Sequence, residues 1–358
     1  MITILYPYRN RELERIKISL DSLLQQRNTD FKVLFVDYGT DEALKKAIKL
    51  LLSTYNFVAY TESYTSFQPW SRAKAINVGL RKVNTEYVFI ADIDMIFRSD
   101  FIEKLQIVKA PNKAIFFKVG FLSESETRLN KDFSNYVVQF YSGYGAQGLS
   151  LFSMKQLIDV NGFDEFFHFW GAEDEDIHNR LQLAGFESIF YEQEILMLHR
   201  WHSTYRASEK KSLTKDFQLS NISRINQKHQ IFNKTKKIQK ANHEKWGNPL
   251  KEAEFNELEN CTGLEQLLNI KSDIDHFLFY ELPNLNKGIL KIIIKEDKFN
   301  KTIKYKVKKF LGKKVPNYYS LKKINDKLLL HIISFYHPYP YYYKVSDDLK
   351  SIVFKIKK

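Results

Sequence analysis

Four consecutive carboxylates behind a run of aromatic residues are the part of this sequence best suited to chemistry. The segment reads Phe166-Phe-His-Phe-Trp-Gly-Ala-Glu-Asp-Glu-Asp176, and apolar residues then recur from Ile177 at the i, i+4, i+7 spacing of one helix face. The spacing predicts a short helix that ends at Gly185 and carries Glu173 and Asp174 in its first turn. Free backbone N–H groups and the positive end of the helix dipole accommodate anions there.

Two interpretations of these acids are open. A single acid at this place would be an ordinary helix cap, but four adjacent like charges repel one another. Their repulsion raises the pKa of each carboxyl while the helix end lowers it, which is one way to prepare a proton acceptor. The preceding aromatic residues, Trp170 among them, suit a wall on which a sugar ring stacks.

A second pair of acids, Asp92-Ile-Asp94, follows an apolar run that predicts a strand at residues 87–92. Side chains alternate along an extended chain, so both carboxylates are expected on the same side. Two oxygens presented together suit a hard divalent cation that keeps positions open for substrate phosphates. The alternative is a pair of solvated aspartates at the start of a loop.

Two histidines follow another predicted strand, in the sequence His199-Arg-Trp-His202. A neutral imidazole could complete a cation site begun by Asp94, with His199 as the first candidate ligand and His202 as its alternative. A structural role for the histidines is the competing interpretation. Asp37 could accept hydrogen bonds from a nucleobase or ribose, or it could close a plain Asp-x-Gly turn. No glycine-rich phosphate loop is present.

The elements that must position these residues alternate between strand and helix. Apolar runs predict strands at residues 2–6, 32–37, 57–60 and 87–92, separated by segments with helical periodicity. This alternation predicts an α/β fold with a mostly parallel central sheet and helices on both faces. Ligands bind beyond the carboxyl ends of the strands in such sheets, and Pro7, Asp37 and Asp92 lie there.

The remainder of the chain changes character twice. Residues 114–119, 148–152, 188–191 and 195–199 predict further strands, and residues 154–160 predict a helix. A polar stretch that follows predicts a helical extension or linker at residues 206–249. Residues 250–358 are basic and rich in aromatic side chains, with strands expected within 287–308 and no fold assigned to the whole. The catalytic domain is expected at residues 1–205.

Composition limits the cellular setting. The chain has 358 residues, a formal net charge of +13 and one cysteine, Cys261, which excludes an intrachain disulfide and favours a reducing compartment. We see neither a secretory signal nor an apolar run of the ~20 residues that span a bilayer, so we expect a cytoplasmic protein. The positive charge fits nucleic acid, an anionic membrane surface or phosphorylated substrates, and does not choose among them.

Several motifs together resemble a known family. They are the strand before Pro7-Tyr-Arg9, Val36-Asp-x-Gly-Thr-Asp41, Arg72-Ala-Lys-Ala-Ile-Asn-Val-Gly79, Asp92-Ile-Asp94, and Asn161-Gly-Phe-Asp-Glu followed by Trp170-Gly-Ala-Glu-Asp. In this order, and with His199, they resemble inverting glycosyltransferases of the GT-A fold. The resemblance is closer to bacterial family-2 enzymes whose catalytic half is similar to β-1,4-galactosyltransferases and chondroitin-polymerase modules. It covers about residues 1–205.

The resemblance implies roles for the matching positions. It implies a metal, Mn²⁺ or Mg²⁺, on Asp94 and His199, a general base at Asp174, and acceptor contacts from Trp170, Gly171 and Glu173. The nucleotide-sugar site, for a UDP-sugar, would comprise Pro7, Tyr8, Arg9, Asp37, Arg72, Asn77 and Asp92. The family's galactosyltransferases carry Gly-Gly before the acids, where this chain has Gly171-Ala172, which leaves the fit of the acceptor open.

The function implied is transfer of a hexose or N-acetylhexosamine from a UDP-sugar to a saccharide or lipid-linked saccharide, in bacterial surface polysaccharide synthesis of the capsule or O-antigen type. The basic C-terminal segment suggests contact with an anionic membrane surface, which would place the protein on the inner face of the plasma membrane. An accessory domain with aromatic core strands explains the same composition.

The alternatives to a glycosyltransferase are a metal-dependent nucleotidyl- or phosphotransferase, a carbohydrate-binding protein and a nucleic-acid binder. A nucleic-acid partner is not expected, because it leaves the acidic motifs unexplained.

Overall fold

The computed structural model describes residues 1–203 and 209–358, which form two compact units. The first comprises Met1–Ser66, residues 70–203 and Ile222–Pro249. The second comprises Phe67–Pro69, residues 209–221 and Leu250–Lys358. The predicted boundary at residues 205–206 lies outside the described residues. The predicted linker is divided, since residues 222–249 group with the first unit and residues 209–221 with the second.

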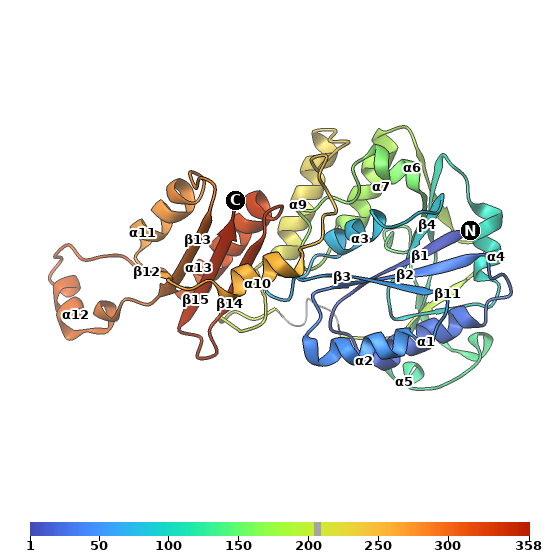
Figure 1. Ribbon diagram of the computed structural model, residues 1–358, viewed down its shortest axis with the longest axis horizontal. Coiled ribbons are helices and arrows are strands. Elements are labelled where there is room, and N and C mark those ends of the chain that lie inside the picture. The colour runs from blue at the N-terminus through green and yellow to red at the C-terminus, as the bar shows by residue number, and fades with distance from the viewer. Residues whose placement is uncertain (204–208) are drawn as a thin grey trace. The chain divides into compact units, whose positions relative to one another are not determined.

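A seven-stranded sheet forms the centre of the first unit, in the order β10-β6-β9-β4-β1-β2-β3 (Figure 1). Only β9 runs against the other six strands, since its pairings with β4 and β6 are antiparallel and the remaining pairings are parallel. The strands are β1 (Ile2–Tyr8), β2 (Phe31–Tyr38), β3 (Val58–Ser63), β4 (Tyr87–Ile90), β6 (Lys113–Phe117), β9 (Ser150–Ser153) and β10 (Glu187–Tyr191). The predicted α/β fold with a mostly parallel sheet is confirmed.

Helices cover both faces of this sheet, as the apolar strands require. One buried cluster joins β1 and β2 to the first group of helices, and a second cluster joins the opposite face to the second group. The first group is α1 (Leu13–Leu24), α2 (Glu42–Leu52) and α4 (Phe101–Val108). The second group is α3 (Arg72–Leu80), α6 (Met154–Asp159) and α7 (Glu173–Leu183) (Figure 1).

The carboxyl ends of the parallel strands meet at one edge of the sheet. Strand β1 extends two residues beyond the predicted end, so that Pro7 and Tyr8 lie inside it and Tyr8 pairs with Asp37. Proline is tolerated in this central strand because the pairing with β4 ends at Leu5, before Pro7. The Asp92–Asp94 segment follows β4 at the same edge.

A smaller four-stranded sheet, in the order β5-β11-β7-β8, follows from the second half of the unit. It brings β11, which ends at His199, beside β5, which begins just after Asp94; the two strands are antiparallel and pair His199 with Met95. Its strands are β5 (Met95–Phe97), β7 (Gly120–Leu122), β8 (Val138–Tyr141) and β11 (Met197–His199), and short helices α5 (Glu124–Thr127) and η1 (Phe133–Asn135) lie between β7 and β8.

Helix α9 (Ile222–Thr235) packs against α7 through buried polar groups. The Arg180 and Asp176 side chains form an ion pair at 2.6 Å, with both side chains only 1% exposed. Asn233 of α9 donates hydrogen bonds to Asp176 and to Asp164, and Asp164 also pairs with His229 at 2.8 Å. The polar residues of the predicted helical segment therefore include internal partners of α7.

The second unit is built on a four-stranded sheet, in the order β12-β13-β15-β14. Lys355 of β15 is buried and donates to the carbonyls of Leu258, Glu259 and Cys261, which close the carboxyl end of α10. The elements are α10 (Glu252–Asn260), β12 (Glu265–Leu268), α11 (Lys271–His276), η2 (Phe277–Glu281), β13 (Ile289–Lys295), η3 (Lys298–Lys301), α12 (Ile303–Phe310), α13 (Leu321–His331), η4 (Ile332–Tyr336), β14 (Tyr341–Val345) and β15 (Ser351–Lys357).

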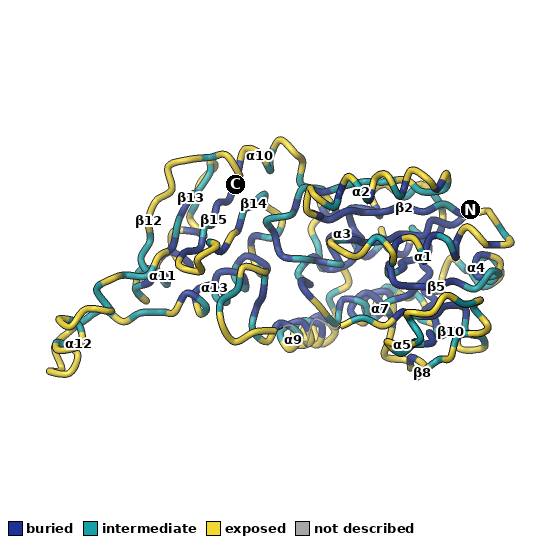
Figure 2. The backbone as a smooth tube through the Cα atoms, turned by 90° about the horizontal axis from the view of Figure 1, so that it is seen from below, coloured by how far each residue is buried: buried dark blue, intermediate teal, exposed yellow. Residues whose placement is uncertain are grey.

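The strand prediction for residues 287–308 is correct only for β13. The chain beyond it forms η3 and α12, because Thr302 accepts a hydrogen bond from the backbone N–H of Tyr305 and so caps a helix. The burial colours of Figure 2 show β15 as mostly buried, β13 as mostly intermediate and α12 as an exposed element.

The buried ion pair between Asp176 and Arg180, both in α7, yields a stability prediction. Asp176→Ala leaves the Arg180 guanidinium buried without its counter-charge, so we expect the free energy of unfolding to fall by about 3–5 kcal/mol. Chemical denaturation followed by circular dichroism measures it. Glu175→Ala, at the neighbouring exposed carboxylate, is the control and should change stability by less than about 1 kcal/mol. Equal losses in the two variants would contradict a structural role specific to Asp176.

Candidate active site

An arginine whose side chain is only 13% exposed lies at the centre of the candidate site. Arg72 donates from Nε to Asp92 Oδ1 at 3.0 Å, from Nη1 to Asp174 Oδ1 at 2.6 Å, and from Nη2 to the carbonyl of Gly148 at 2.9 Å. Glu173 Oε1 lies 4.0 Å from Nη1. One planar guanidinium thus joins the segment after β4, the first turn of α7 and the turn before β9.

The position of Arg72 follows from how α3 begins. Ser71 is the N-cap of this helix, and its hydroxyl oxygen accepts a hydrogen bond from the backbone N–H of Lys74. The same hydroxyl donates to the carbonyl of Phe167 at 2.7 Å. The start of α3 is therefore fixed to the aromatic run that precedes the acids.

Glu173 and Asp174 are the two acids that face Arg72. Burial first, and then the neighbouring Asp174, raise the pKa of Glu173 to about 7 against the opposing effect of Arg72. The pKa of Asp174 is also raised, by burial first, with Arg72 acting against it and Asp92 adding to it. Both carboxyls are thus shifted toward the pKa range of groups that exchange protons near neutral pH.

The four adjacent acids lie in three different environments, which reduces the repulsion among them within one helical turn. Glu173 and Asp174 face Arg72, Glu175 is exposed and accepts from Gln230, and Asp176 belongs to the ion pair with Arg180. Only the first two acids of the row, Glu173 and Asp174, lie at the candidate site, and the catalytic and acceptor roles that the resemblance implies for them stay predictions.

The loop that carries Trp170 has an unusual backbone. Phe169, Gly171 and Ala172 have φ angles of 66°, 101° and 74°, in the left-handed region. Glycine occupies this region without strain, whereas phenylalanine and alanine do so at a cost of about 1–2 kcal/mol each. Asn226 of α9 donates to the carbonyl of Trp170 at 3.0 Å, and the indole side chain is 43% exposed.

Ala172 stands where the resembling galactosyltransferases have a second glycine. Its positive φ shows the reason that glycine suits this position, because Ala172 is the N-cap residue from which α7 starts.

Asp94, His199 and His202 form a triad whose ligand atoms all lie within 4.8 Å of one another. His202 Nε2 is 2.9 Å from Asp94 Oδ2, and His199 Nε2 is 3.6 Å from Asp94 Oδ1. Among the described residues, nothing forms a hydrogen bond with the buried Oδ1 atom of Asp94 or the buried Nδ1 atom of His199. A buried carboxylate oxygen without a hydrogen bond, beside two imidazoles, suits a divalent cation. Both histidines, and not only one of them, lie at this candidate site.

The charges within the triad also influence one another. Burial alone would raise the pKa of Asp94, but His199 and His202 outweigh it and hold that pKa well below its usual range. The hydrogen bond to Asp94 in turn raises the pKa of His202. Asp94 is thus ionised and available as a ligand at neutral pH.

The two carboxylates of the Asp92-Ile-Asp94 motif do not act as one pair. A turn replaces the predicted end of the strand, since β4 stops at Ile90, and it directs Asp92 to Arg72 and Asp94 to the histidines. The expected presentation of both carboxylates on one side of an extended chain is therefore corrected. The motif instead connects the arginine cluster to the cation triad.

The predicted nucleotide residues lie at the carboxyl edge of the sheet. Asp37 is fully buried, and its two oxygens accept from the Thr40 N–H and the Tyr60 hydroxyl, both at 2.8 Å. This arrangement is the Asp-x-Gly turn, with Gly39 at a φ of 87°. Arg9 donates to the carbonyl of Ser66 at 2.7 Å. Tyr8 is buried and its hydroxyl is bonded to the backbone of Arg11.

Asn77 is not placed at this edge. Its amide donates to the carbonyl of Phe163 at 2.8 Å and to Glu165 at 3.0 Å, and its oxygen accepts from the Phe163 N–H. The residue has no exposed surface. The assignment of Asn77 to the donor site is therefore corrected, because its side chain joins α3 to the loop after α6.

Residues that the sequence did not single out complete the site. A Cβ at Gly148 would come to 2.9 Å from Asp174 Oδ2, so a side chain at this position would displace the carboxylate of Asp174. The signal in the sequence is a glycine at the first residue of the strand predicted at 148–152. A cavity of about 250 Å³ adjoins α7, with an aromatic, amide and charged lining: Tyr144, Gly145, Gln147, Glu175, His178, Asn179, Gln182 and Lys234.

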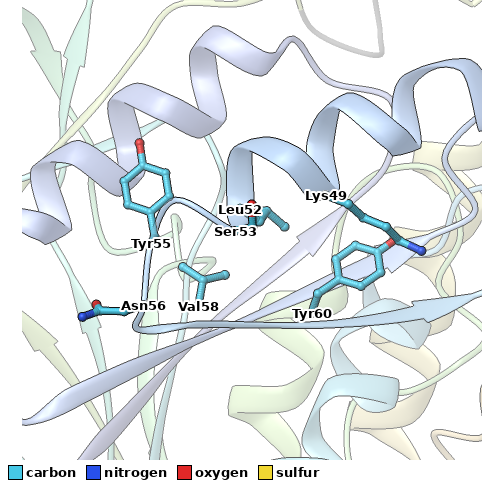
Figure 3. A pocket seen from close by; sticks show the side chains of 7 residues that line it. All are labelled: Lys49, Leu52, Ser53, Tyr55, Asn56, Val58 and Tyr60. Atoms are coloured by element: carbon cyan, nitrogen blue, oxygen red, sulfur yellow. The ribbon is translucent and has the colours of Figure 1, made fainter.

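A second cavity, of about 410 Å³, lies between the end of α2 and the start of β3 (Figure 3). Lys49 and Tyr60 lie side by side there, with the ammonium 5.0 Å from the ring centre. It adjoins the amino end of β3, whereas the candidate site is beyond the carboxyl ends, and it shares with that edge only Tyr60, whose hydroxyl donates to Asp37.

Comparison with known proteins relates this arrangement to glycosyltransferases. Residues 128–205 match the family described as N-terminal domain of galactosyltransferase, and the match includes Trp170, Glu173, Asp174 and both histidines. Chondroitin sulfate synthase 3 of Homo sapiens is 21% identical over 197 residues, which are 51% of this chain and 22% of that protein. β-1,4-Galactosyltransferase 5 of Danio rerio is 28% identical over 136 residues, which are 37% of this chain and 31% of that protein.

The chain is thus a distant homologue of these glycosyltransferases and spans less than a third of the length of either. Among solved structures, S. aureus TarS 1–349 in complex with UDP has 16% sequence identity and a TM-score of 0.43, and covers 56% of this chain and 60% of that chain. The resemblance to galactosyltransferases and chondroitin-synthesising enzymes is confirmed at this level. A bacterial family-2 origin stays a prediction.

The raised pKa of Glu173 yields a prediction for stability against pH. Between its ordinary value of 4.5 and about 7 the folded chain holds a proton that the unfolded chain has released, so stability falls as pH rises through this range. Glu173→Gln removes this loss. We compare the free energy of unfolding of the variant with that of the parent at each pH. We expect this difference to be about 1–3 kcal/mol more in favour of the variant at pH 8 than at pH 4.5.

Denaturation curves at both pH values measure this difference. Glu175→Gln, at the exposed neighbouring acid, should show no such dependence. A gain for Glu173→Gln that is the same at both pH values would show that the carboxyl is not the source.

Proposed function

We propose that this chain is a metal-dependent inverting glycosyltransferase that moves a hexose or N-acetylhexosamine from a UDP-sugar to a saccharide acceptor. One observation carries the proposal. The acid pair Glu173–Asp174 and the cation triad are attached to the same short segment, through Arg72 on Asp92 and through His199 and His202 on Asp94. The proposed proton acceptor and the proposed cation site are thus adjacent, which supports metal-dependent sugar transfer from a nucleotide.

Asp174 is the proposed general base. It takes the proton of an acceptor hydroxyl as that oxygen attacks the anomeric carbon, and the bond from this carbon to the UDP oxygen breaks in the same displacement. One displacement inverts the anomeric centre. The bond from Arg72 to Oδ1 orients the carboxylate, and the absence of a side chain at Gly148 leaves space beside Oδ2. Glu173 holds the acceptor as a second carboxyl with a raised pKa.

Asp94 and His199, with His202 as a further ligand, would hold the metal, Mn²⁺ or Mg²⁺. A bound divalent cation would act as a Lewis acid that stabilises charge on the departing diphosphate. The unpartnered Oδ1 of Asp94 and Nδ1 of His199 support this placement.

The donor is proposed to lie along the carboxyl edge of the sheet. Pro7, Tyr8, Arg9 and Asp37 would line its uridine pocket, Asp92 would contact the ribose, and Arg72 would lie near the diphosphate. The acceptor would stack on exposed Trp170 beside Gly171. The cavity next to α7, with Tyr144 and several amides, offers hydrogen-bonding groups for further sugar units.

The setting proposed is bacterial surface polysaccharide synthesis, of the capsule or O-antigen type, in the cytoplasm or on the inner face of the plasma membrane. The acceptor would then be a free or lipid-linked saccharide. In the part of the chain that the structure describes, no helix has the length and apolar character to cross a bilayer.

Removal of the proposed base is the direct test of mechanism. Asp174→Asn keeps the shape of the side chain but cannot accept the proton, so we expect transfer to fall by about 10²–10⁴-fold. UDP binding should stay close to that of the parent. A radiolabelled UDP-sugar transfer assay and UDP titration calorimetry measure the two quantities. Asp159→Asn, at a surface carboxylate of α6, is the control, and an Asp174→Asn enzyme with near-parental turnover would refute the assignment.

Loss of the cation site should be visible in binding without any turnover. UDP at ~100 times its dissociation constant should stabilise the folded parent by about 2.7 kcal/mol when Mn²⁺ is present. We expect EDTA, Asp94→Ala and His202→Ala each to remove most of this stabilisation, measured by thermal denaturation. A panel of GDP, CDP and UDP-sugars in the same assay identifies the donor. Stabilisation by UDP that is unaffected by EDTA would argue against a metal-dependent donor site.

A further inference from the structure

A strongly basic segment in the second unit is the feature that the proposed transfer reaction does not use. Residues 298–314 contain no Asp or Glu. They contain a dense set of lysines in and around η3 and α12: Lys298, Lys301, Lys304, Lys306, Lys308, Lys309, Lys313 and Lys314. Such a density of one charge on a short segment creates a local field that attracts anionic surfaces.

The same segment exposes an apolar stripe. Ile303, Val307, Phe310 and Leu311 are 79%, 49%, 90% and 59% exposed, and they follow the i, i+4, i+7, i+8 spacing of one helix face. No residue of α12 is buried. A scattered exposed apolar side chain needs no explanation, but four on one face of a helix mark an interaction surface.

The opposite side of α12 is fixed to the unit, so the stripe has a defined direction. Tyr305 packs edge-on against Phe299 and Tyr318, at 5.6 Å between ring centres in both cases. Its hydroxyl donates to the carbonyl of Pro316 at 3.3 Å. Thr302 caps the helix through its bond with the Tyr305 N–H. The helix therefore presents its apolar stripe outward and its tyrosine inward.

The charges select among the partners that an apolar stripe could have. A second copy of this face would bring lysines against lysines, in a chain whose net charge is already +13. Nucleic acid would be attracted by the lysines but would leave Ile303, Val307 and Leu311 without a use, since bases stack on aromatic rings. An anionic lipid surface satisfies both features, because headgroups pair with lysines while the apolar side chains enter the acyl boundary.

We propose that α12 docks the chain on an anionic membrane surface, with Ile303, Val307, Phe310 and Leu311 inserted below the headgroups and the flanking lysines among them. Docking would bring the chain to the layer in which a lipid-linked acceptor lies. The contact itself does not depend on the transfer reaction, so either proposal can fail without the other.

The test is co-sedimentation of the full chain with vesicles. Vesicles of equal parts phosphatidylglycerol and phosphatidylcholine should bind it at low salt, and pure phosphatidylcholine vesicles should bind it at least about tenfold more weakly. Ile303→Ser with Val307→Ser and Phe310→Ser removes the stripe and keeps every lysine. Lys304→Gln with Lys306→Gln, Lys308→Gln and Lys309→Gln removes charge and keeps the stripe. We expect each combination to weaken binding to anionic vesicles by about tenfold or more.

Matched controls lie in the first unit. Leu50→Ser with Ile107→Ser removes two exposed apolar side chains, which are 73% and 70% exposed. Lys228→Gln with Lys236→Gln, Lys237→Gln and Lys240→Gln removes four exposed lysines. Both controls should bind vesicles within about twofold of the parent, because their changes lie outside the docking surface. The far-ultraviolet circular dichroism spectrum and the midpoint of thermal denaturation should be the same in all variants, which verifies folding independently of the transfer reaction.

Three results would overturn the proposal. The first is a parent chain that does not bind anionic vesicles at low salt, including the case in which it binds single-stranded RNA through the same lysines. The second is parental binding by the apolar-stripe variant, which would reduce the contact to unspecific charge attraction. The third is an equal loss in the lysine control of the first unit.

Discussion

The candidate site depends on one buried guanidinium with three acceptors. Arg72 would be costly to bury alone, and the carboxylates of Asp92 and Asp174 together with the carbonyl of Gly148 offset that cost. The same hydrogen bonds hold three segments that are distant in sequence at one guanidinium. The pKa of Arg72 is raised in this environment, because Asp174, Asp92 and Glu173 outweigh its desolvation. The arginine is therefore a permanent cation, and the ionisation of its acidic partners is what solution conditions can change.

The arginine cluster and the cation triad differ in how far their polar groups are satisfied by neighbouring residues. The arginine half is internally compensated, with each polar group of Arg72 engaged by a neighbour. The triad of Asp94, His199 and His202 contains buried atoms with unmet hydrogen-bonding needs. The first half is thus organised before any substrate arrives, whereas the second contains buried atoms that the described residues leave without a partner. Asp92 and Asp94 belong to the same turn, so a short stretch of backbone connects the two halves.

The sequence predicted what local patterns determine and missed what distant partners determine. Apolar runs identified β1, β2 and β4, and helical spacing identified α7 with Glu173 and Asp174 in its first turn. Asn77 was misassigned because its partner, Phe163, is far along the chain and nothing near Asn77 reveals it. Alternation of apolar residues and lysines around Lys304 favoured a strand, although the same residues also match a helix face, and the cap at Thr302 decides between the two. The separate destinations of Asp92 and Asp94 required the turn that only the fold specifies.

The composition of the second unit has a consequence for the modularity of this protein. Phe67–Pro69, from within the catalytic half of the sequence, belongs to that unit: Tyr343 donates to the carbonyl of Phe67 at 3.0 Å, and Tyr342 packs on its ring at 4.2 Å between centres. Residues 209–221 belong to it as well, where Asn325 donates to the carbonyl of Gln218. The two units are therefore interleaved along the chain. A cut before residue 250 does not separate them, and recombination with a relative would have to exchange three segments together.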